Sequence, residues 1–115
     1  MTNLPDLTRR IIAFRDERDW KQFHKPKDMA LSLMLESAEV AELFQWKSDV
    51  EIERTLSEKR NALGRELADV LYWTLLLAHD AGIDLASAFE SKMAENEKKY
   101  PVELARGSNK KYTEL

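Results

Sequence analysis

Apolar residues recur along most of this chain at intervals of three and four, which is the spacing of amphipathic α-helices. The first such series consists of Leu7, Ile11 and Phe14, and it predicts a helix over roughly residues 5–19. The charged residues of this segment, Arg15 among them, are expected on its solvent side. The chain therefore begins with a helix that has one apolar face to cover.

Two longer segments are almost wholly apolar. Residues 31–46, LSLMLESAEVAELFQW, predict a second helix over 28–46, and residues 67–78, LADVLYWTLLLA, belong to a third helix predicted over 57–79. Residues 48–56 between them are polar and fit a short helix or a loop equally well. Because the segments 31–46 and 67–78 carry so few charged residues, we expect these parts of the two helices to be mostly buried.

Residues that favour helix ends delimit these segments. The candidate N-caps are Asn3, Asp28, Ser57 and Asp84. Gly82 is expected to end the third helix, and Pro101 closes a fourth helix over 85–100, after which residues 101–115 are a polar tail without a period. The sequence thus predicts one all-α domain over residues 1–115 with four main helices.

Composition narrows the class of protein. Hydrophobic residues make up 43% and charged residues 34%, as in globular domains, and three Gly with three Pro are too few for a β-sandwich. The absence of Cys excludes disulfides and thiolate metal sites, and the N-terminal residues lack the apolar core of a signal peptide, so we expect a cytoplasmic protein. No apolar run reaches the roughly 18 residues of a membrane span, and a net charge of −3 gives no reason to expect a nucleic-acid partner.

Acidic residues interrupt the two apolar segments in pairs. Glu36 and Glu39 lie one helical turn apart in the second predicted helix, and Glu66 and Asp69 repeat that spacing in the third. Burying unpaired carboxylates is costly, and the first segment contains no Lys or Arg that would neutralise them. If the two helices pack at an axial distance of about 8–10 Å, the four carboxylates converge on one cavity.

The chemistry of such a cavity indicates a hard divalent cation. Four carboxylates balance the charge of two such ions, and ligand sets made only of oxygen favour Mg²⁺ or Mn²⁺ over Zn²⁺. Mg²⁺ commonly takes phosphate oxygens as its remaining ligands, which suggests a phosphate-containing substrate. A di-iron site would need a His three residues after a Glu, and neither His24 nor His79 is so placed. The alternative is that both pairs are ordinary surface carboxylates or form salt bridges with another helix.

Aromatic side chains accompany the acidic pairs. The candidates for stacking on a nucleobase are Trp20, His24, Trp46 and Trp73. Trp73 follows Asp69 by four residues and so lies on the same helix face, whereas Trp20 and His24 belong to the loop after the first helix. Tryptophans at helical spacing are also common in protein cores, and for Trp73 and Trp46 both interpretations stay open.

The fourth predicted helix carries a polar stripe. Lys92, Asn96 and Lys99 follow one another at the spacing i, i+4, i+7. Ammonium and amide groups suit the outer oxygens of a triphosphate, although a solvated helix face has the same pattern. The chain has no Gly-rich phosphate loop, which excludes phosphate recognition of that kind.

The motif Glu36-x-x-Glu39 followed by Glu66-x-x-Asp69 resembles the paired carboxylates of the MazG-like all-α nucleoside triphosphate pyrophosphatases. The segments RDWKQFHKP, ELFQWK, SKM…KKYP and KKYTEL are similar to the dCTP pyrophosphatase branch of that family, and the resemblance covers essentially the whole chain. Trp73 stands where a Tyr is expected in eukaryotic relatives, and Ile11 where a His is expected. Both positions are near the expected base pocket, so dCTP, dATP and modified dCTP are all candidate substrates.

The resemblance implies a four-helix subunit that assembles as a homodimer or homotetramer, with sites built across subunit contacts. It implies Mg²⁺-dependent hydrolysis of a deoxynucleoside triphosphate between its α- and β-phosphates, as a means of cleaning the nucleotide pool, with Mn²⁺ as a possible substitute. The metal ligands would be Glu36, Glu39, Glu66 and Asp69. Catalysis would rest on Glu36 and Glu39, with Glu39 orienting the attacking water. The base or sugar contacts would be Trp20, His24 and Trp46, and the phosphate contacts Lys92 and Asn96.

Two other functions fit the same residues. A non-catalytic nucleotide-binding or helical protein-interaction module would use the aromatic pocket and tolerate the loss of any one carboxylate. A structural protein would pair its acidic faces with basic residues of a partner chain. Release of pyrophosphate in the presence of Mg²⁺ distinguishes the enzyme from both.

Overall fold

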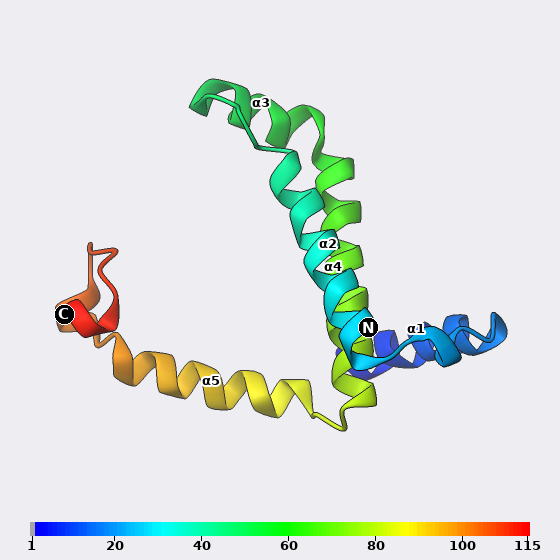
Figure 1. Cartoon of the computed structure of the whole chain (residues 1–115). Helices are drawn as coiled ribbons and strands as arrows, with labels where there is room; N and C mark the ends of the chain where they lie inside the picture. The colour runs from blue at the N-terminus through cyan, green and yellow to red at the C-terminus, as the bar shows by residue number, and fades with distance from the viewer. Residues whose placement is uncertain (1) are drawn as a thin grey trace. The chain divides into compact units, whose positions relative to one another are not determined.

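The computed structural model describes residues 2–115, and within that range the regular structure is entirely helical (Figure 1). This confirms the predicted all-α class. The elements are α1 (Leu4–Glu17), η1 (Lys21–Phe23), α2 (Pro26–Glu42), α3 (Asp49–Glu58), α4 (Arg60–Asp80), α5 (Leu85–Lys99), α6 (Val102–Ala105) and η2 (Tyr112–Glu114). The chain forms two compact units, one ending at Gly82 and containing α1–α4, the other comprising Ile83–Leu115. The assignment of residues 1–115 to one domain stays a prediction.

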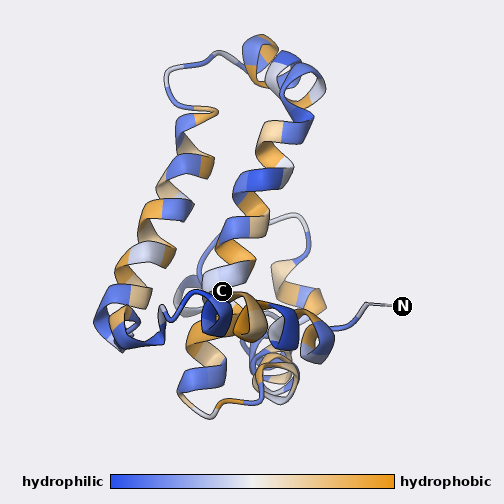
Figure 2. Cartoon of the chain, turned by 90° about the vertical axis from the view of Figure 1, so that its right-hand side faces the viewer, coloured by the Kyte–Doolittle hydropathy of each residue, from blue (hydrophilic) through white to orange (hydrophobic). Residues whose placement is uncertain are grey.

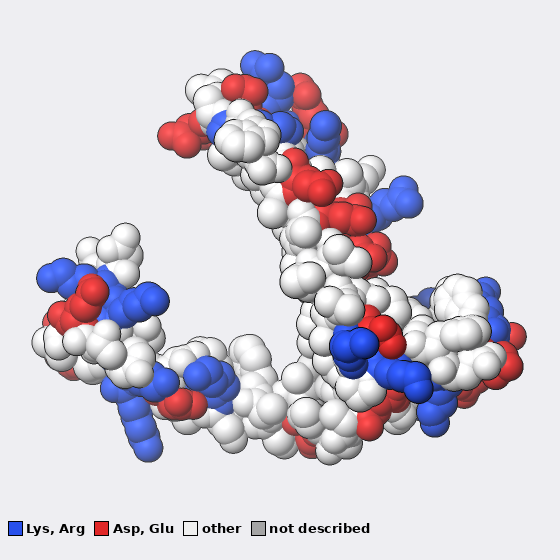
Figure 3. Space-filling model, viewed as in Figure 1, with Lys and Arg blue, Asp and Glu red and all other residues white. Residues whose placement is uncertain are grey.

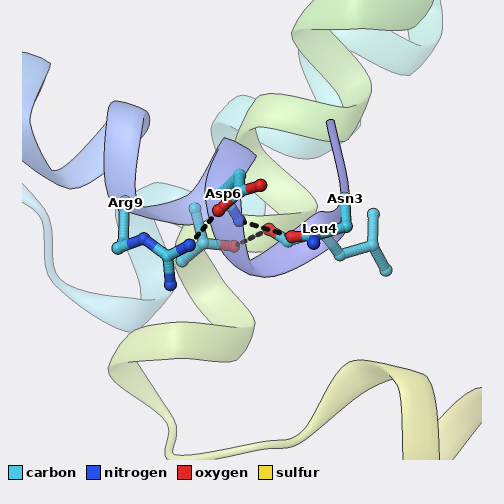
Figure 4. A network of polar contacts seen from close by, with 5 residues as sticks. Asn3, Leu4, Asp6 and Arg9 are labelled. Atoms are coloured by element: carbon cyan, nitrogen blue, oxygen red, sulfur yellow. Dashed lines mark hydrogen bonds and ion pairs between the residues drawn. The ribbon is translucent and has the colours of Figure 1, made fainter. Parts of the chain in front are cut away.

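The start of α1 follows the capping pattern in the sequence. The Asn3 side-chain oxygen accepts a hydrogen bond from the Asp6 amide at 2.9 Å, and Pro5 occupies the first turn. Asp6 also forms an ion pair with Arg9 one turn further along (Figure 4). A polar cap and a proline that needs no amide partner together fix where this helix begins.

The boundaries of α2 differ from those predicted. The helix begins at Pro26 with Lys25 at the N-cap, so Asp28 lies inside the first turn, where a carboxylate favours the positive end of the helix dipole. It ends at Glu42 instead of Trp46, because residues 43–46 form turns and Trp46 has a left-handed backbone with φ of 67°. An apolar run therefore did not guarantee a continuous helix.

The polar segment after α2 forms a helix of its own. The Ser48 hydroxyl accepts from the Glu51 amide at 3.3 Å, and the Glu51 carboxylate accepts from the Ser48 amide at 3.3 Å, which is a capping box. This box starts α3, so Ser57 lies within α3 and is not the N-cap of the next helix, which begins at Arg60. The prediction of a helix from residue 57 was wrong by three residues because the stronger start signal lies upstream.

The end of α4 and the start of α5 match the sequence signals. Gly82 adopts φ of +69°, a conformation that residues with a Cβ rarely adopt, and it follows the C-cap of α4. The Asp84 carboxylate then accepts from the Ser87 amide at 3.2 Å and caps α5. Residues 81–84 are therefore sufficient to explain why α4 ends and α5 begins here.

Within the second unit, the expected polar tail is partly ordered against α5. Tyr112 in η2 lies 6.2 Å from Tyr100, edge to face, and the Lys99 ammonium is 4.7 Å from the Tyr112 ring centroid. Lys99 also forms an ion pair with Glu95 at 2.9 Å. The sequence pattern of residues 101–115, which has no helical period, did not indicate that Tyr112 would pack against α5 and Tyr100.

In the first unit, α2 runs alongside α4 over most of its length, and α1 packs on α4 as well (Figure 1). The buried apolar side chains among the described residues are Met29, Leu75, Leu76 and Ala78. Arg15 is also buried, with only 1% of its surface exposed, so its predicted place on the solvent side of α1 was wrong. Its guanidinium donates two hydrogen bonds to the Asp80 carboxylate, at 2.7 and 3.1 Å, which satisfies a charge that could not otherwise be buried.

Much of the apolar surface of α2 and α4 remains uncovered in this chain. On α2, Leu31, Met34 and Leu35 are 46–60% exposed, and on α4 Leu67 and Leu71 are 51% and 39% exposed. Orange apolar positions recur along both helices in Figure 2, and in Figure 3 a row of acidic side chains follows the same pair of helices beside surface without charge. Exposed apolar surface of this extent is typical of interaction faces. No helix within residues 2–115 is both long and apolar enough to cross a bilayer.

Candidate functional site: an acidic cluster beside an aromatic cavity

Three of the four carboxylates singled out in the sequence meet between α2 and α4. Glu36, Glu39 and Glu66 each offer one oxygen atom, and the three atoms lie within 4.8 Å of one another. Glu36 and Glu39 come from one face of α2 because they are three residues apart, and Glu66 faces them because α2 and α4 pack side by side. Glu36 and Glu66 are half-buried, and Glu39 is exposed. This group is called the acidic cluster below.

Asp69, the fourth predicted ligand, lies next to the acidic cluster but outside the 4.8 Å group. It is exposed, lines the same cavity as Glu36, and its charge raises the pKa values of both Glu36 and Glu66. A side chain on the turn after Glu66 is therefore close enough to act on the cluster electrostatically.

Crowding of like charges perturbs the acidic cluster. Burial raises the pKa of Glu36, and the neighbouring Glu39 and Asp69 raise it further. The pKa of Glu66 is raised to about 7, first because its carboxyl group can hydrogen-bond to Glu39 and next because it is desolvated. One proton shared between carboxyl groups relieves part of the repulsion. At neutral pH the cluster is thus poised to exchange that proton for another positive charge.

The unpaired oxygens of the acidic cluster test whether a metal ion fits there. Glu36 Oε2 and Glu66 Oε2 are both inaccessible to solvent and have no hydrogen-bond partner among the residues described. An ionised carboxylate oxygen buried without a donor is costly. Carboxylate oxygens at this spacing suit a hard divalent cation, which would satisfy both oxygens at once. The residues present therefore fit a metal ion.

A cavity of about 770 Å³ adjoins the acidic cluster. Its lining residues from α1 include Leu7, Arg10, Ile11 and Phe14, and those from α4 include Asp69, Leu71, Tyr72, Trp73 and Leu75. Glu36 is also part of the lining, so carboxylates and apolar side chains share one cavity. A ligand with an apolar ring and an anionic group would find complementary surroundings for each part, provided that a cation offsets the charge.

Five aromatic rings form a continuous edge-to-face series along this cavity. The successive centroid distances are 5.2 Å for His24–Trp73, 5.0 Å for Trp73–Tyr72, 6.3 Å for Tyr72–Phe14 and 5.7 Å for Phe14–Trp20. The series joins Trp20 and His24, the two residues that flank η1, to α1 and α4. Such contacts favour a fixed orientation of each ring, which gives a flat ligand a preformed surface.

The surroundings of His24 in this series favour its neutral form. Burial lowers its pKa below 6.5, and the positive charge of Arg15 lowers it further, with Asp80 acting in the opposite direction. Its Nδ1 atom is buried and has no hydrogen-bond partner among the residues described. His24 therefore contributes a ring to the cavity lining whose protonation is disfavoured by its surroundings.

The remaining predicted contacts are not brought to this cavity within the first unit. Trp46 is 92% exposed and does not line the cavity. Lys92, Asn96 and Lys99 belong to the second unit, where Lys92 and Lys99 both form ion pairs with Glu95, at 3.5 and 2.9 Å. The predicted roles of these residues stay predictions.

Sequence reasoning missed part of the cavity wall. Tyr72 and Phe14 are members of the aromatic series, and Leu7 lines the cavity, yet all three were interpreted only as helix positions or not at all. The signal for Phe14 and Leu7 was the apolar stripe of the first helix. An apolar stripe of this kind does not indicate whether its side chains will line a cavity or pack in a closed core.

Comparisons with known proteins point to one enzyme family. A family model described as MazG-like matches residues 31–115, which include all four carboxylates. The chain is 47% identical to dCTP pyrophosphatase 1 of Rattus norvegicus and 46% identical to that of Homo sapiens, and each match covers 97% of this chain and 67% of the relative. It also resembles the crystal structure of a pyrophosphatase from Archaeoglobus fulgidus, with a TM-score of 0.82 and 37% identity over 88% of this chain and 94% of that one.

Proposed function

This chain belongs to the MazG-like family, and on that premise we propose that it hydrolyses a deoxynucleoside triphosphate to the monophosphate and pyrophosphate. The observation that carries the proposal is the acidic cluster, with its two unpaired buried oxygens, at one edge of an aromatic cavity. The names of the relatives make dCTP the first candidate substrate. The proposed setting is the cytoplasmic nucleotide pool, from which the enzyme would remove surplus or modified nucleotides.

We propose Mg²⁺ as the cofactor, held by Glu36, Glu39 and Glu66 with Asp69 as a fourth ligand, and Mn²⁺ as a substitute. The all-oxygen ligand set supports this choice, since hard cations prefer oxygen and readily accept phosphate oxygens as further ligands. A divalent cation bound there would activate water and offset the charge of the triphosphate.

Different side chains are proposed to orient the attacking water and to hold the base. Glu39, the exposed member of the acidic cluster, is proposed to orient the attacking water by accepting a hydrogen bond from it. The oxygen of that water forms a bond to one phosphorus atom of the α–β phosphoanhydride while the bond from that phosphorus to the bridging oxygen breaks. The proton of the water passes to solvent, and the monophosphate and pyrophosphate leave. Trp73, Trp20 and His24 are proposed to hold the base and exclude water from the cavity.

We also propose that the active form is a homodimer or homotetramer. The exposed apolar residues of α2 and α4 support this, because a second copy would cover them. Within such an assembly, Trp46, Lys92, Asn96 and Lys99 are proposed to complete the base and phosphate contacts. Their exposure or surface pairing in one chain is compatible with that role.

Pyrophosphate release tests the proposed activity. We expect pyrophosphate and dCMP in equal amounts from dCTP with Mg²⁺, and none when EDTA removes the metal. Parallel assays with dATP, dTTP and 5-methyl-dCTP rank the bases. A chain that binds dCTP and raises its melting temperature without releasing pyrophosphate would instead be a nucleotide-binding module.

The raised pKa of Glu66 predicts a pH dependence of metal-free stability. The folded pKa of about 7 lies above the usual 4.5, so the stabilising contribution is present below about pH 4.5 and is lost as the pH rises through 7. We therefore expect the melting temperature in EDTA to fall between about pH 5.5 and about pH 8. Mg²⁺ should raise it more at the higher pH, because metal ligands must be deprotonated.

Differential scanning fluorimetry of the wild type and Glu66→Gln checks this prediction. The variant cannot lose a proton at that position, so its melting temperature in EDTA should vary less with pH. A wild-type melting temperature that Mg²⁺ leaves unchanged at both pH values would contradict metal binding by the acidic cluster.

A further inference from the structure

The ion pair between Arg15 and Asp80 is not part of the lining of the aromatic cavity. Arg15 is at the end of α1 and Asp80 is the last residue of α4, and neither lines the cavity. The guanidinium meets the carboxylate in a two-point contact, at 2.7 and 3.1 Å, and the side chains are 1% and 18% exposed. This contact fixes both the distance and the rotation of the two helix ends relative to each other.

The backbone of Arg15 connects this pair to Trp20. The Arg15 carbonyl accepts hydrogen bonds from the amides of Arg18 and Trp20, both at 3.2 Å. Between them, Asp19 adopts φ of 53°, a left-handed conformation that turns the chain sharply. Because the turn is anchored on Arg15, a shift of that residue would displace Trp20 from the cavity that it lines.

The same pair lies close to the other end of the aromatic series. Arg15 and Asp80 both act electrostatically on His24, and His24 packs on Trp73 at 5.2 Å. Trp73 precedes Asp80 on α4 by about two helical turns. The ion pair therefore connects the turn that carries Trp20 to the helix that carries Trp73 and Asp69, and His24 lies near both of its charges.

Stability alone does not account for a charged pair at this place. An apolar pair of similar volume is often as stabilising as a buried ion pair, since both charges lose their hydration. What apolar side chains lack is a directional contact. We propose that the Arg15–Asp80 pair is a positioning device that holds Trp20 and His24 in register with Trp73, so that the cavity is preformed for its ligand. This inference rests on the proposed nucleotide binding.

The double variant Arg15→Met/Asp80→Leu separates positioning from stability. It replaces the pair by apolar side chains, so the far-UV circular dichroism and the melting shift caused by Mg²⁺ should stay close to those of the wild type. We expect the KM for dCTP to rise at least about tenfold, with kcat within a few-fold, because the acidic cluster is not in contact with the pair. The near-UV circular dichroism of the coupled aromatic rings should weaken in parallel.

Two further variants keep the test decisive. Arg15→Lys retains the charge without the two-point contact, and it should show the same rise in KM even if the double variant does not fold. The matched control is Arg9→Met, which removes an exposed ion pair from the same helix and should leave KM unchanged.

The outcomes divide cleanly. A folded double variant, or a folded Arg15→Lys variant, with the wild-type KM and near-UV spectrum would overturn the positioning role. Failure of the wild type itself to bind or hydrolyse dCTP would instead refute the proposed function. In that case the near-UV spectra alone still decide whether the pair orders the aromatic rings.

Discussion

Replacing Glu36 with Gln is expected to lower the rate of pyrophosphate release by about 10³-fold or more while leaving the helical content unchanged. Glu36 is the member of the acidic cluster that also lines the cavity, so metal and substrate would both be close to its carboxylate. A metal ion contributes several kcal/mol to stabilising charge in a transition state. Since about 1.4 kcal/mol corresponds to a tenfold change in rate, loss of a ligand translates into the expected effect.

The matched control is Glu42→Gln on the same helix. Glu42 is exposed and is not part of the acidic cluster, so this variant removes the same charge from α2 without touching the proposed ligands. It should retain nearly full activity. Equal rates for Glu36→Gln and the wild type at saturating Mg²⁺ would exclude the carboxylate from the mechanism.

Although Glu36→Gln is expected to lower activity, it should not lower the stability of the metal-free protein. Burial and neighbouring acids raise the pKa of Glu36, which means that its ionised form is unfavourable in the folded chain. In EDTA at about pH 8, Glu36→Gln should therefore melt at or above the temperature of the wild type. Loss of activity together with retained or increased stability is the pattern expected of a functional site under electrostatic strain.

The second large effect is expected from Trp73→Ala. Trp73 lies between His24 and Tyr72 in the aromatic series and lines the cavity. Stacking of a base on an aromatic side chain is worth about 1–3 kcal/mol, so KM for the triphosphate should rise about 5- to 150-fold. The effect on kcat should be smaller, because the acidic cluster keeps its residues.

Two comparisons distinguish stacking from general damage to the core. Trp73→Tyr keeps an aromatic face in the cavity and should lose much less affinity than Trp73→Ala. Phe23→Ala removes an aromatic ring that is 63% exposed and absent from the cavity lining, and it should leave KM unchanged. If Trp73→Ala lowered the melting temperature but left KM at the wild-type value, Trp73 would be a core residue only.

The sequence by itself determined those features that depend on neighbours in the chain. The caps at Asn3 and Asp84 and the stop at Gly82 were predictable because a side chain or a missing Cβ acts on backbone within three residues. The two acidic pairs were predictable as faces because residues three apart on a helix point the same way. Three of these four side chains, Glu36, Glu39 and Glu66, come together because α2 and α4 also pack side by side.

Only the tertiary structure decided where long-range contacts put each face. Arg15 has the local pattern of a solvated residue, and its burial depends on Asp80, which is 65 residues away. The aromatic series likewise joins Phe14, Trp20 and His24 to Tyr72 and Trp73, which no periodicity relates. Helix caps and turns depend on residues that are adjacent in the sequence, so they can be predicted from it. The burial of a charge or the lining of a cavity depends on which distant side chains pack against each other, and the tertiary structure decides this.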